Sequence, residues 1–178
     1  GCSIPTHAML EFQLAHAQAR DAVYQALDVD ALTSNLAENG LYSIHVQSLA
    51  TDKEIYLKRP DLGRLLDDES KQKIANDQYT RNENFDVCIV IGDGLSSFAI
   101  EENAVTFINA FKEQIVEEKW TLAPIVIATG SRVALGDQVA ELLNAKMLVM
   151  LIGERPGLSS PDSMGIYYTW DAKTGYLD

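Results

Sequence analysis

Residues 85–94 read FDVCIVIGDG, a continuous apolar and largely β-branched run that ends at two glycines around Asp93. Runs without polar alternation are typical of strands that a parallel sheet buries on both faces. Parallel strands need a crossover connection, usually a helix, between one strand and the next. We therefore expect a helix soon after Gly94 and further buried strands beyond it.

The downstream sequence repeats this strand–turn–helix pattern. Ser96 or Ser97 can cap a helix that continues to about residue 119, with apolar positions at helical spacing. Residues 124–128 (PIVIA) and 147–152 (MLVMLI) predict two more buried strands, with a short helix between them. That helix is expected over residues 137–144. The order predicts an α/β fold: a Rossmann-like parallel sheet with right-handed crossovers and helices on both faces.

The N-terminal part is predicted to be helical. Thr6 can cap a first helix, and a second helix over residues 29–39 would end at Gly40, which tolerates the left-handed cap geometry. The chain is therefore divided into an N-terminal helical segment, residues 1–40, and an α/β domain, residues 41–178.

The segment before the first buried strand is more polar. Residues 42–48 (YSIHVQS) alternate and predict an amphipathic strand, and residues 55–57 (IYL) are expected to form a short strand. A turn over residues 58–64 contains Pro60, whose ring fixes its backbone angle. Residues 67–69 (DDE) favour a helix start, because carboxylates are stabilised at the positive end of the helix dipole.

The charge of the chain argues against nucleic-acid and membrane partners. Acidic side chains number 26 against 14 basic ones, a net charge of −12. Such a surface repels phosphate backbones and anionic lipids. No apolar run approaches the ~20 residues that a membrane span requires, and no signal peptide is visible. We expect a cytoplasmic protein.

Cysteine and histidine usage offers no framework of disulfides and no metal site. Cys2 and Cys88 are the two cysteines, and Cys88 lies inside an apolar run, where a small buried core residue is expected. His7 and His16 are too far apart to share one helical turn as a pair of metal ligands. His45 stands alone and is given no role.

Three polar turns follow the three buried strands. They are residues 92–94 (GDG), 130–133 (GSRV) and 153–155 (GER). In open parallel sheets, ligands bind beyond the carboxyl ends of the strands. Because all three turns fall at that edge, their convergence predicts a ligand-binding edge more strongly than any one turn alone.

Two of these turns have alternative interpretations. Residues 92–97 match part of a dinucleotide fingerprint, and Arg132 would suit a 2′-phosphate, so a stand-alone NAD(P)-binding Rossmann oxidoreductase stays open. The third glycine and the acidic residue expected ~20 positions later are absent. Glu154 and Arg155 end a buried strand and need partners there. They form either an ion pair that shapes the loop or a site where Glu154 accepts hydrogen bonds from a ligand.

The sequence lacks a recognisable set of catalytic residues. The polar loop over residues 159–165 has no histidine near it in sequence, so a serine nucleophile has little support. The chain shows no nucleophile elbow, P-loop, zinc spacing or obvious acid/base pair. If the protein takes part in catalysis, the chemistry is expected to belong to a cofactor or to another subunit.

Four strings together resemble one family, in both order and separation. They are residues 55–64 (IYLKRPDLGR), 86–96 (DVCIVIGDGLS), 132–139 (RVALGDQV) and 151–158 (LIGERPGL). This set is similar to the small (light) subunit of ethanolamine ammonia-lyase, and the resemblance covers nearly the whole chain. The GERPG and YLxRPDxGR strings are its most specific parts.

The resemblance implies an adenosylcobalamin enzyme that converts ethanolamine to acetaldehyde and ammonia by radical chemistry. In this family the large (heavy) subunit, a TIM barrel, carries substrate and catalytic residues, while the small subunit covers the cobalamin at the subunit interface. The family assembles as a hexamer of heterodimers, often inside a bacterial microcompartment. This division of labour agrees with the missing catalytic set, since the protein orients the cofactor and the cofactor reacts.

Two residues match cobalamin-contacting positions of the family. They are Val133, whose polar contact would come from its backbone, and Glu154, whose carboxylate would accept bonds from a corrin amide or a ribose. The alternative for Val133 is that it only begins a helix.

A third family contact, a cysteine in a Cys-Ile-Ser-Asn string, is expected beyond Asp178, so the chain is expected to be truncated. The family's N-terminal extension and basic stretch are also missing. Besides the cobalamin-covering subunit and the NAD(P)-binding oxidoreductase, a third possible function is that of a structural subunit that caps the barrel without touching the cofactor.

Overall fold

The computed structural model describes residues 5–156 and 162–175, apart from the side chains of residues 18, 19, 21 and 22. Cys2, residues 159–161 of the polar loop at 159–165 and the C-terminal Asp178 lie outside the described residues. The helices are α1 (Thr6–Tyr24), α2 (Val29–Glu38), α3 (Lys53–Lys58), the 3-10 turn η1 (Leu62–Arg64), α4 (Asp68–Asn76), α5 (Ser97–Glu117) and α6 (Leu135–Leu142). The strands are β1 (Ser43–Gln47), β2 (Phe85–Gly92), β3 (Ile125–Thr129), β4 (Ala145–Gly153) and β5 (Met164–Trp170).

The strands form a five-stranded sheet in the order β1-β3-β2-β4-β5. The first four are parallel, and β5 pairs with β4 in the antiparallel direction. The predicted α/β fold with a Rossmann-like parallel sheet is therefore confirmed, and the antiparallel edge strand β5 is an addition that was not predicted. β2 lies at the centre, with Val90 opposite Val126 on one side and Met150 on the other. This central place explains why its sequence is apolar on both faces.

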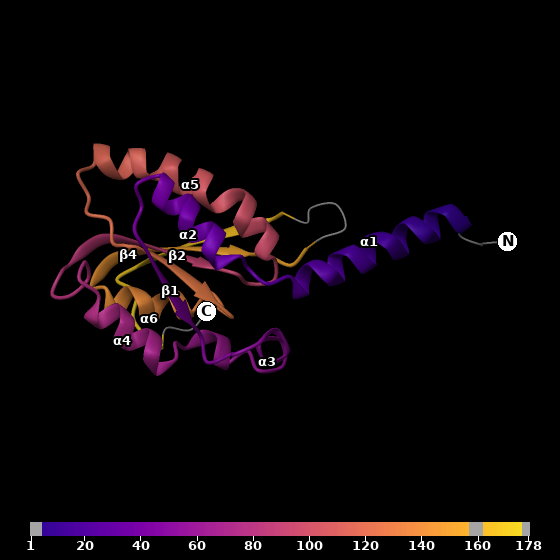
Figure 1. The fold of residues 1–178 in the computed structure, drawn as a ribbon, viewed down its shortest axis with the longest axis horizontal. Helices are drawn as coiled ribbons and strands as arrows, with labels where there is room; N and C mark the ends of the chain where they lie inside the picture. Colours follow the sequence, from indigo (N-terminus) through magenta and orange to yellow (C-terminus); the bar gives the residue numbers. More distant parts are fainter. Residues whose placement is uncertain (1–4, 157–161, 176–178) are drawn as a thin grey trace.

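Helices cover both faces of the sheet, and each face has its own hydrophobic core (Figure 1). Side chains of β2 alternate between them: Cys88 and Val90 belong to one core, and Ile89 and Ile91 to the other. Helices α4 and α6 close the first core, while α2 and α5 close the second. Burying one such aliphatic side chain contributes roughly 1.5–3 kcal/mol, so the two cores supply most of the favourable energy of folding.

Capping side chains begin several helices where the sequence indicated. The Ser96 hydroxyl accepts from the backbone N–H of Ala99 at the start of α5, and Asp67 accepts from Ser70 at the start of α4. At the C-terminus of α2, Gly40 follows the cap with φ +68°, as its position predicted. Helix α6 begins at Leu135, two residues before the expected start.

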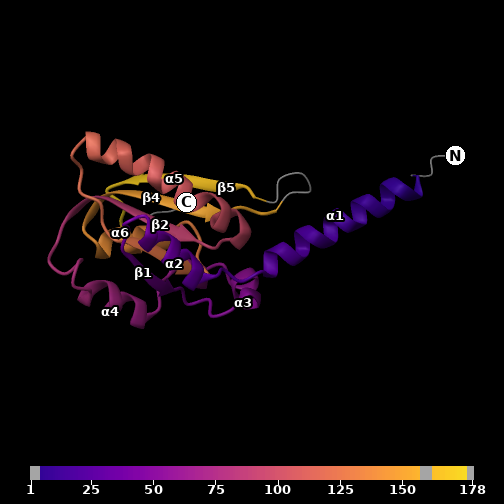
Figure 2. The same ribbon diagram turned by 45° about the horizontal axis from the view of Figure 1, so that its top comes forward.

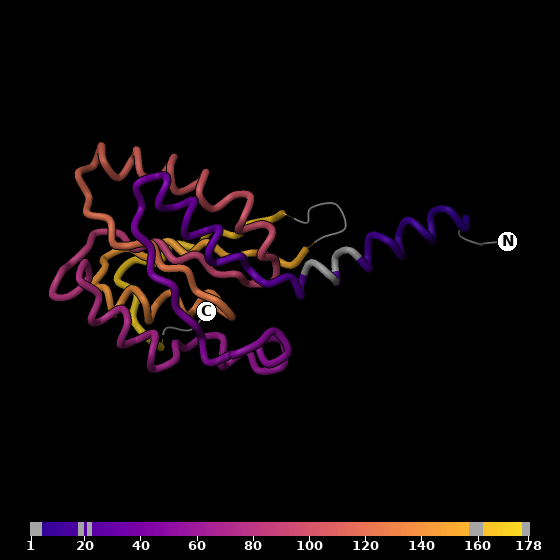
Figure 3. Tube along the Cα trace, in the orientation of Figure 1, coloured from indigo at the N-terminus to yellow at the C-terminus, as the bar shows by residue number. Residues whose placement is uncertain are grey.

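Helix α1 extends away from the α/β body, as Figure 2 and the trace in Figure 3 show. Its apolar side chains Met9, Leu10, Phe12 and Leu14 are exposed. The segment after α1 is tied to the body, because the Ser97 hydroxyl donates to the Gln25 carbonyl at 2.8 Å. Helix α2 packs into the second core. The domain boundary between residues 1–40 and 41–178 stays a prediction.

The expected strand at residues 55–57 is wrong, because this segment is the middle of helix α3. Three apolar residues in a row do not distinguish a strand from a helical turn. The flanking residues decide for the helix: Asp52 caps it by accepting from the Ile55 N–H at 2.8 Å, and Glu54 pairs with Lys58 one turn later. Tyr56 is thereby turned into the protein interior.

Strand β5 was not anticipated from the sequence. Its residues, MGIYYTW, have the aromatic and β-branched composition of strands. The strand lacks the sharp polar alternation of a half-buried strand, since Ile166, Tyr168 and Trp170 are all exposed. Its position matters for the ligand edge, because it places Gly165 and Tyr167 beside the end of β4.

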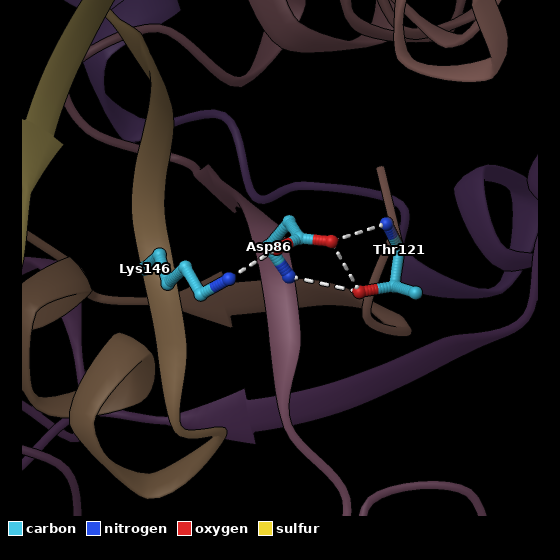
Figure 4. A network of polar contacts seen from close by, with 3 residues as sticks. All are labelled: Asp86, Thr121 and Lys146. Atoms are coloured by element: carbon cyan, nitrogen blue, oxygen red, sulfur yellow. Dashed lines mark hydrogen bonds and ion pairs between the residues drawn. The ribbon is translucent and has the colours of Figure 1, made fainter. Parts of the chain in front are cut away.

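At the amino edge of the sheet, Asp86 joins three segments (Figure 4). One carboxylate oxygen accepts from the Lys146 ammonium at 2.7 Å, and the other accepts from the backbone N–H and the hydroxyl of Thr121, each at 2.9 Å. The Lys146 bond, followed by the two Thr121 bonds, lowers the pKa of Asp86 to about 2 from its ordinary 3.8. The ionised carboxylate therefore stabilises the register of β2 against β4 and the loop before β3.

We predict that Asp86→Asn lowers the free energy of unfolding at neutral pH. Because the pKa of Asp86 is depressed on folding, its contribution is fully present above pH 3.8 and disappears as the pH falls toward about 2. Urea unfolding across this range should show the variant and wild type converging at low pH. Glu54→Gln, which removes an exposed carboxylate paired with Lys58, is the control and should cost less than about 1 kcal/mol. A deficit in Asp86→Asn that does not depend on pH would contradict the assignment.

Candidate functional site

The turns after β2 and β3 are joined by one buried carboxylate. Asp93 accepts hydrogen bonds from the backbone N–H groups of Gly130 and Ser131, both at 3.0 Å. Burial raises the pKa of Asp93, while the nearby Lys53 ammonium and these N–H groups act in the opposite direction. Hydrogen bonds to a charged group contribute about 1.5–3 kcal/mol each, so Asp93 fixes the position of the turn that precedes Val133.

The turn after β4 is held against the turn after β2 by direct backbone contact. The N–H of Leu95 donates to the Gly153 carbonyl at 2.7 Å. Gly94 has φ +53°, and a Cβ added there would lie 2.3 Å from that same carbonyl oxygen. The predicted convergence of the three turns at one edge is therefore confirmed, and glycine is required where two of them touch.

This contact removes the basis of the nicotinamide interpretation. The glycines of a dinucleotide fingerprint leave space for a pyrophosphate to approach the backbone. In this protein the space beside Gly92 is taken by the Ser131 side chain, and the space beside Gly94 is taken by Gly153. The partial match at residues 92–97 thus reflects packing between turns, and the NAD(P)-binding alternative is not supported.

A cleft of about 190 Å³ opens at this edge and brings the two sequence-predicted residues together. Val133 comes from the turn after β3, and Glu154 comes from the end of β4. The remaining lining combines aliphatic, aromatic and basic side chains with a glycine: Tyr56, Arg64, Leu95, Arg132, Ile152, Gly153 and Tyr167. The cleft can therefore offer an apolar wall together with both signs of charge.

Glu154 is held by a tyrosine. Its carboxylate accepts from the Tyr167 hydroxyl at 2.8 Å, and this bond raises the pKa of Tyr167. Its backbone N–H donates to the Ser163 carbonyl at 2.9 Å. Arg155 is exposed and is not the ion-pair partner of Glu154. The Glu154 side chain lines the cleft, and its role toward a ligand stays a prediction.

Tyr56 forms the opposite part of the cleft. Its side chain is buried, and the Arg132 guanidinium lies over its ring at 4.5 Å, with the Lys53 ammonium 5.0 Å from the ring centre. Arg132 also donates from Nη2 to the Tyr56 carbonyl at 3.0 Å. Burial raises the pKa of Tyr56 to about 12, so its hydroxyl stays protonated at physiological pH.

A second, smaller cleft of about 160 Å³ shares Tyr56 as a wall. The segment between α1 and α2 and the ends of β1 and β3 line it, together with Lys53 and Asp93. Burial lowers the pKa of Lys53, whose ammonium donates to the Gly94 carbonyl at 2.7 Å. Lys53 and Asp93, which lie between the two clefts, thus hold the turns in place through their hydrogen bonds.

Several residues of the cleft were not identified from the sequence. Tyr56 and Arg64 lie in the IYLKRPDLGR string, which was noted for its resemblance and not for its position at the edge. Arg132 was considered only as a contact for a 2′-phosphate. Tyr167 could have been found only by recognising β5, because its place beside Glu154 depends on antiparallel pairing with β4. A signal existed in the aromatic run of β5, but the pairing direction could not be read from it.

The other residues singled out from the sequence have structural positions. Cys88 is fully buried, as expected, and burial raises the pKa of its thiol to about 12. His7 pairs with Glu11 on α1, and His45 contacts the Thr129 hydroxyl at 3.0 Å. Within residues 5–156 and 162–175, His, Cys, Asp and Glu side chains form no group of three that could hold a metal ion. No helix in those same ranges is long and apolar enough to cross a bilayer.

Comparison with known proteins gives matches over the whole chain. The family model described as "Ethanolamine ammonia-lyase light chain (EutC)" matches residues 1–178. The ethanolamine ammonia-lyase small subunit of Pseudomonas syringae pv. tomato is 49% identical over 178 residues, which cover 100% of this chain and 62% of the relative. The small subunits from Pseudomonas fluorescens SBW25 and Pseudomonas aeruginosa PAO1 are 48% and 46% identical, again over 100% of this chain, and 64% and 65% of their own lengths are covered. The chain therefore spans less than two thirds of these relatives.

We predict that Gly94→Ala destabilises the protein more than Gly40→Ala does. Both positions have positive φ, which costs an alanine about 1–2 kcal/mol. A Cβ at Gly40 has open space around it, whereas a Cβ at Gly94 meets the Gly153 carbonyl. Overpacking of this kind should cost about 1–3 kcal/mol more, measured by urea unfolding. Equal losses in the two variants would show that the turns can separate freely.

Proposed function

Because the chain belongs to the ethanolamine ammonia-lyase light chain family, we propose that it acts as the small subunit of an adenosylcobalamin-dependent ammonia-lyase. The reaction is the conversion of ethanolamine to acetaldehyde and ammonia. The observation that supports a cofactor role for this chain is the shared cleft of Val133 and Glu154. These residues are 21 positions apart in sequence and come from different strand ends.

The chemistry of the cleft fits one wall of a corrin site. The half-buried Leu95 and Val133, with the largely buried Ile152, give the cleft an apolar wall that would pack against the cofactor. Glu154 accepts hydrogen bonds and suits the amide N–H groups of corrin side chains or a ribose hydroxyl. Arg132, whose Nη2 donates to the Tyr56 carbonyl, also lines the cleft and adds a positive charge to it.

The size of the cleft supports a site that another polypeptide completes. A whole cobalamin molecule is larger than this cleft, so this chain would cover only part of it. We propose that the large subunit provides the other wall and the substrate-binding residues. When bound, adenosylcobalamin supplies the radical chemistry. Val133 and Glu154 would hold the cofactor in orientation, and the apolar residues would exclude water from it.

Assembly and location follow from the same family membership as predictions. We propose that the protein pairs with its large subunit as a heterodimer and that six such heterodimers form the enzyme, inside a bacterial microcompartment. The exposed apolar side chains of α1 are consistent with burial against another chain in such an assembly.

We predict that the full-length protein, co-expressed with its large subunit, turns over ethanolamine only when adenosylcobalamin is present. Acetaldehyde formation, coupled to an NADH-dependent reductase, measures the rate. Cyanocobalamin is the control, because it binds like the cofactor and lacks the adenosyl group. Turnover without any corrinoid would contradict the proposed function.

We also predict that Glu154→Ala weakens cobalamin binding by the same complex by about tenfold or more, as expected for a lost charge-assisted hydrogen bond. Equilibrium dialysis with cyanocobalamin measures the affinity. Glu117→Ala, an exposed carboxylate at the end of α5, is the matched control and should bind like wild type. An unchanged affinity in Glu154→Ala would favour a subunit that only caps its partner.

A further inference from the structure

Three charged side chains line the cleft, Arg64, Arg132 and Glu154, and the last two do not pair with each other. Arg132 and Glu154 both line it, yet Glu154 is bonded to Tyr167, and Arg132 is bonded to the Tyr56 carbonyl. Among the described residues, no carboxylate oxygen forms an ion pair with the Arg132 guanidinium. A space that separates opposite charges in this way is suited to a ligand with both donors and anionic acceptors.

The positive charge of Arg132 is only partly compensated. The side chain is half-buried, and its partners are a neutral carbonyl and a neutral phenol ring. Removing a charge from water without an opposite charge is costly. The three nitrogens of the guanidinium have different environments: Nη2 is bonded and Nε is buried without an acceptor, which leaves Nη1 as the donor available to a ligand.

Arg132 is also held in place before any ligand binds. Its backbone N–H donates to the Gly63 carbonyl at 2.8 Å, and a Cβ at Gly63 would lie 3.1 Å from the Arg132 Cγ. Its guanidinium is stacked on Tyr56, whose own position is fixed by burial. A side chain that is already ordered loses little entropy when it binds, so such an arginine is suited to recognition.

We propose that Arg132 binds the phosphodiester of the cobalamin nucleotide and so selects corrinoids that carry this group. The proposal rests on the proposed function. Adenosylcobalamin has several neutral amide groups and one anionic side group, the phosphodiester. A neutral amide would not offset the charge of Arg132, whereas guanidinium and phosphate match in both charge and geometry. Glu154 would then meet the donors of the same ligand, so the two charged residues have separate tasks.

The test compares two corrinoids that differ in this group. The full-length protein in complex with its large subunit is titrated with cyanocobalamin and with dicyanocobinamide, which lacks the nucleotide and its phosphodiester. Binding is measured by equilibrium dialysis. Arg132→Met should lose about 10–100-fold in affinity for cyanocobalamin, the equivalent of one charge-assisted hydrogen bond, and less than about twofold for dicyanocobinamide.

Two further variants keep the test independent of folding. Arg132→Lys retains the charge and should lose less cyanocobalamin affinity than Arg132→Met does. Arg81→Met removes an exposed arginine from the loop before β2, at the opposite edge of the sheet, and should bind both corrinoids like wild type. Circular dichroism and thermal unfolding confirm that each complex is folded.

Each outcome has a defined meaning. Selective loss of cyanocobalamin affinity in Arg132→Met supports the proposal. An unchanged affinity, or an equal loss for both corrinoids, overturns it and assigns Arg132 to packing against Tyr56. If the wild-type complex binds neither corrinoid, the proposed function itself fails, and this proposal fails with it.

Discussion

The buried carboxylate of Asp93 is the interaction on which the candidate site depends. It accepts two backbone hydrogen bonds from the turn after β3, and these bonds fix the positions of Arg132 and Val133 relative to β2. The turn after β4 is fixed to the same loop by contact between Leu95 and Gly153. Three turns that are distant in sequence therefore behave as one edge, and the cleft is the space that they leave.

The parallel sheet forms this edge. Its central strands are apolar on both faces and hold their register through two separate cores. Several polar groups lie where the strands end, among them Asp93, Lys53 and Arg132. Charged side chains in this position are expensive to desolvate unless they are bonded, and Asp93 and Lys53 are bonded to backbone groups. Arg132 is bonded to the Tyr56 carbonyl through Nη2, but its buried Nε has no acceptor in the described part of the chain.

Much of this arrangement could be predicted from the sequence, for reasons that particular residues make clear. Uninterrupted apolar runs predicted β2, β3 and β4, and the direction of a parallel sheet then required their turns to meet. Glu154 and Val133 were found through the resemblance of the strings that contain them. The pattern could not give the partner of Glu154, because Tyr167 reaches it only through the antiparallel strand β5. Nor could it give the role of Tyr56, since the IYL run was taken for a strand until the Asp52 cap placed it in a helix.

The glycine pair around Asp93 shows where a motif can mislead. A partial fingerprint was read as a possible nucleotide site, but the space beside each glycine is filled by a neighbouring turn. A glycine that permits a ligand to approach and a glycine that permits another turn to approach have the same one-letter code. Only the surrounding fold distinguishes them.

The central claim is that this edge forms one wall of a cofactor site. Its most direct test is a structure, at a resolution that defines side chains, of the full-length protein and its large subunit with bound cobalamin. The account predicts the corrinoid between the two chains, with the Glu154 carboxylate and the Val133 backbone within hydrogen-bonding distance of it. A cobalamin located away from these two residues would contradict it.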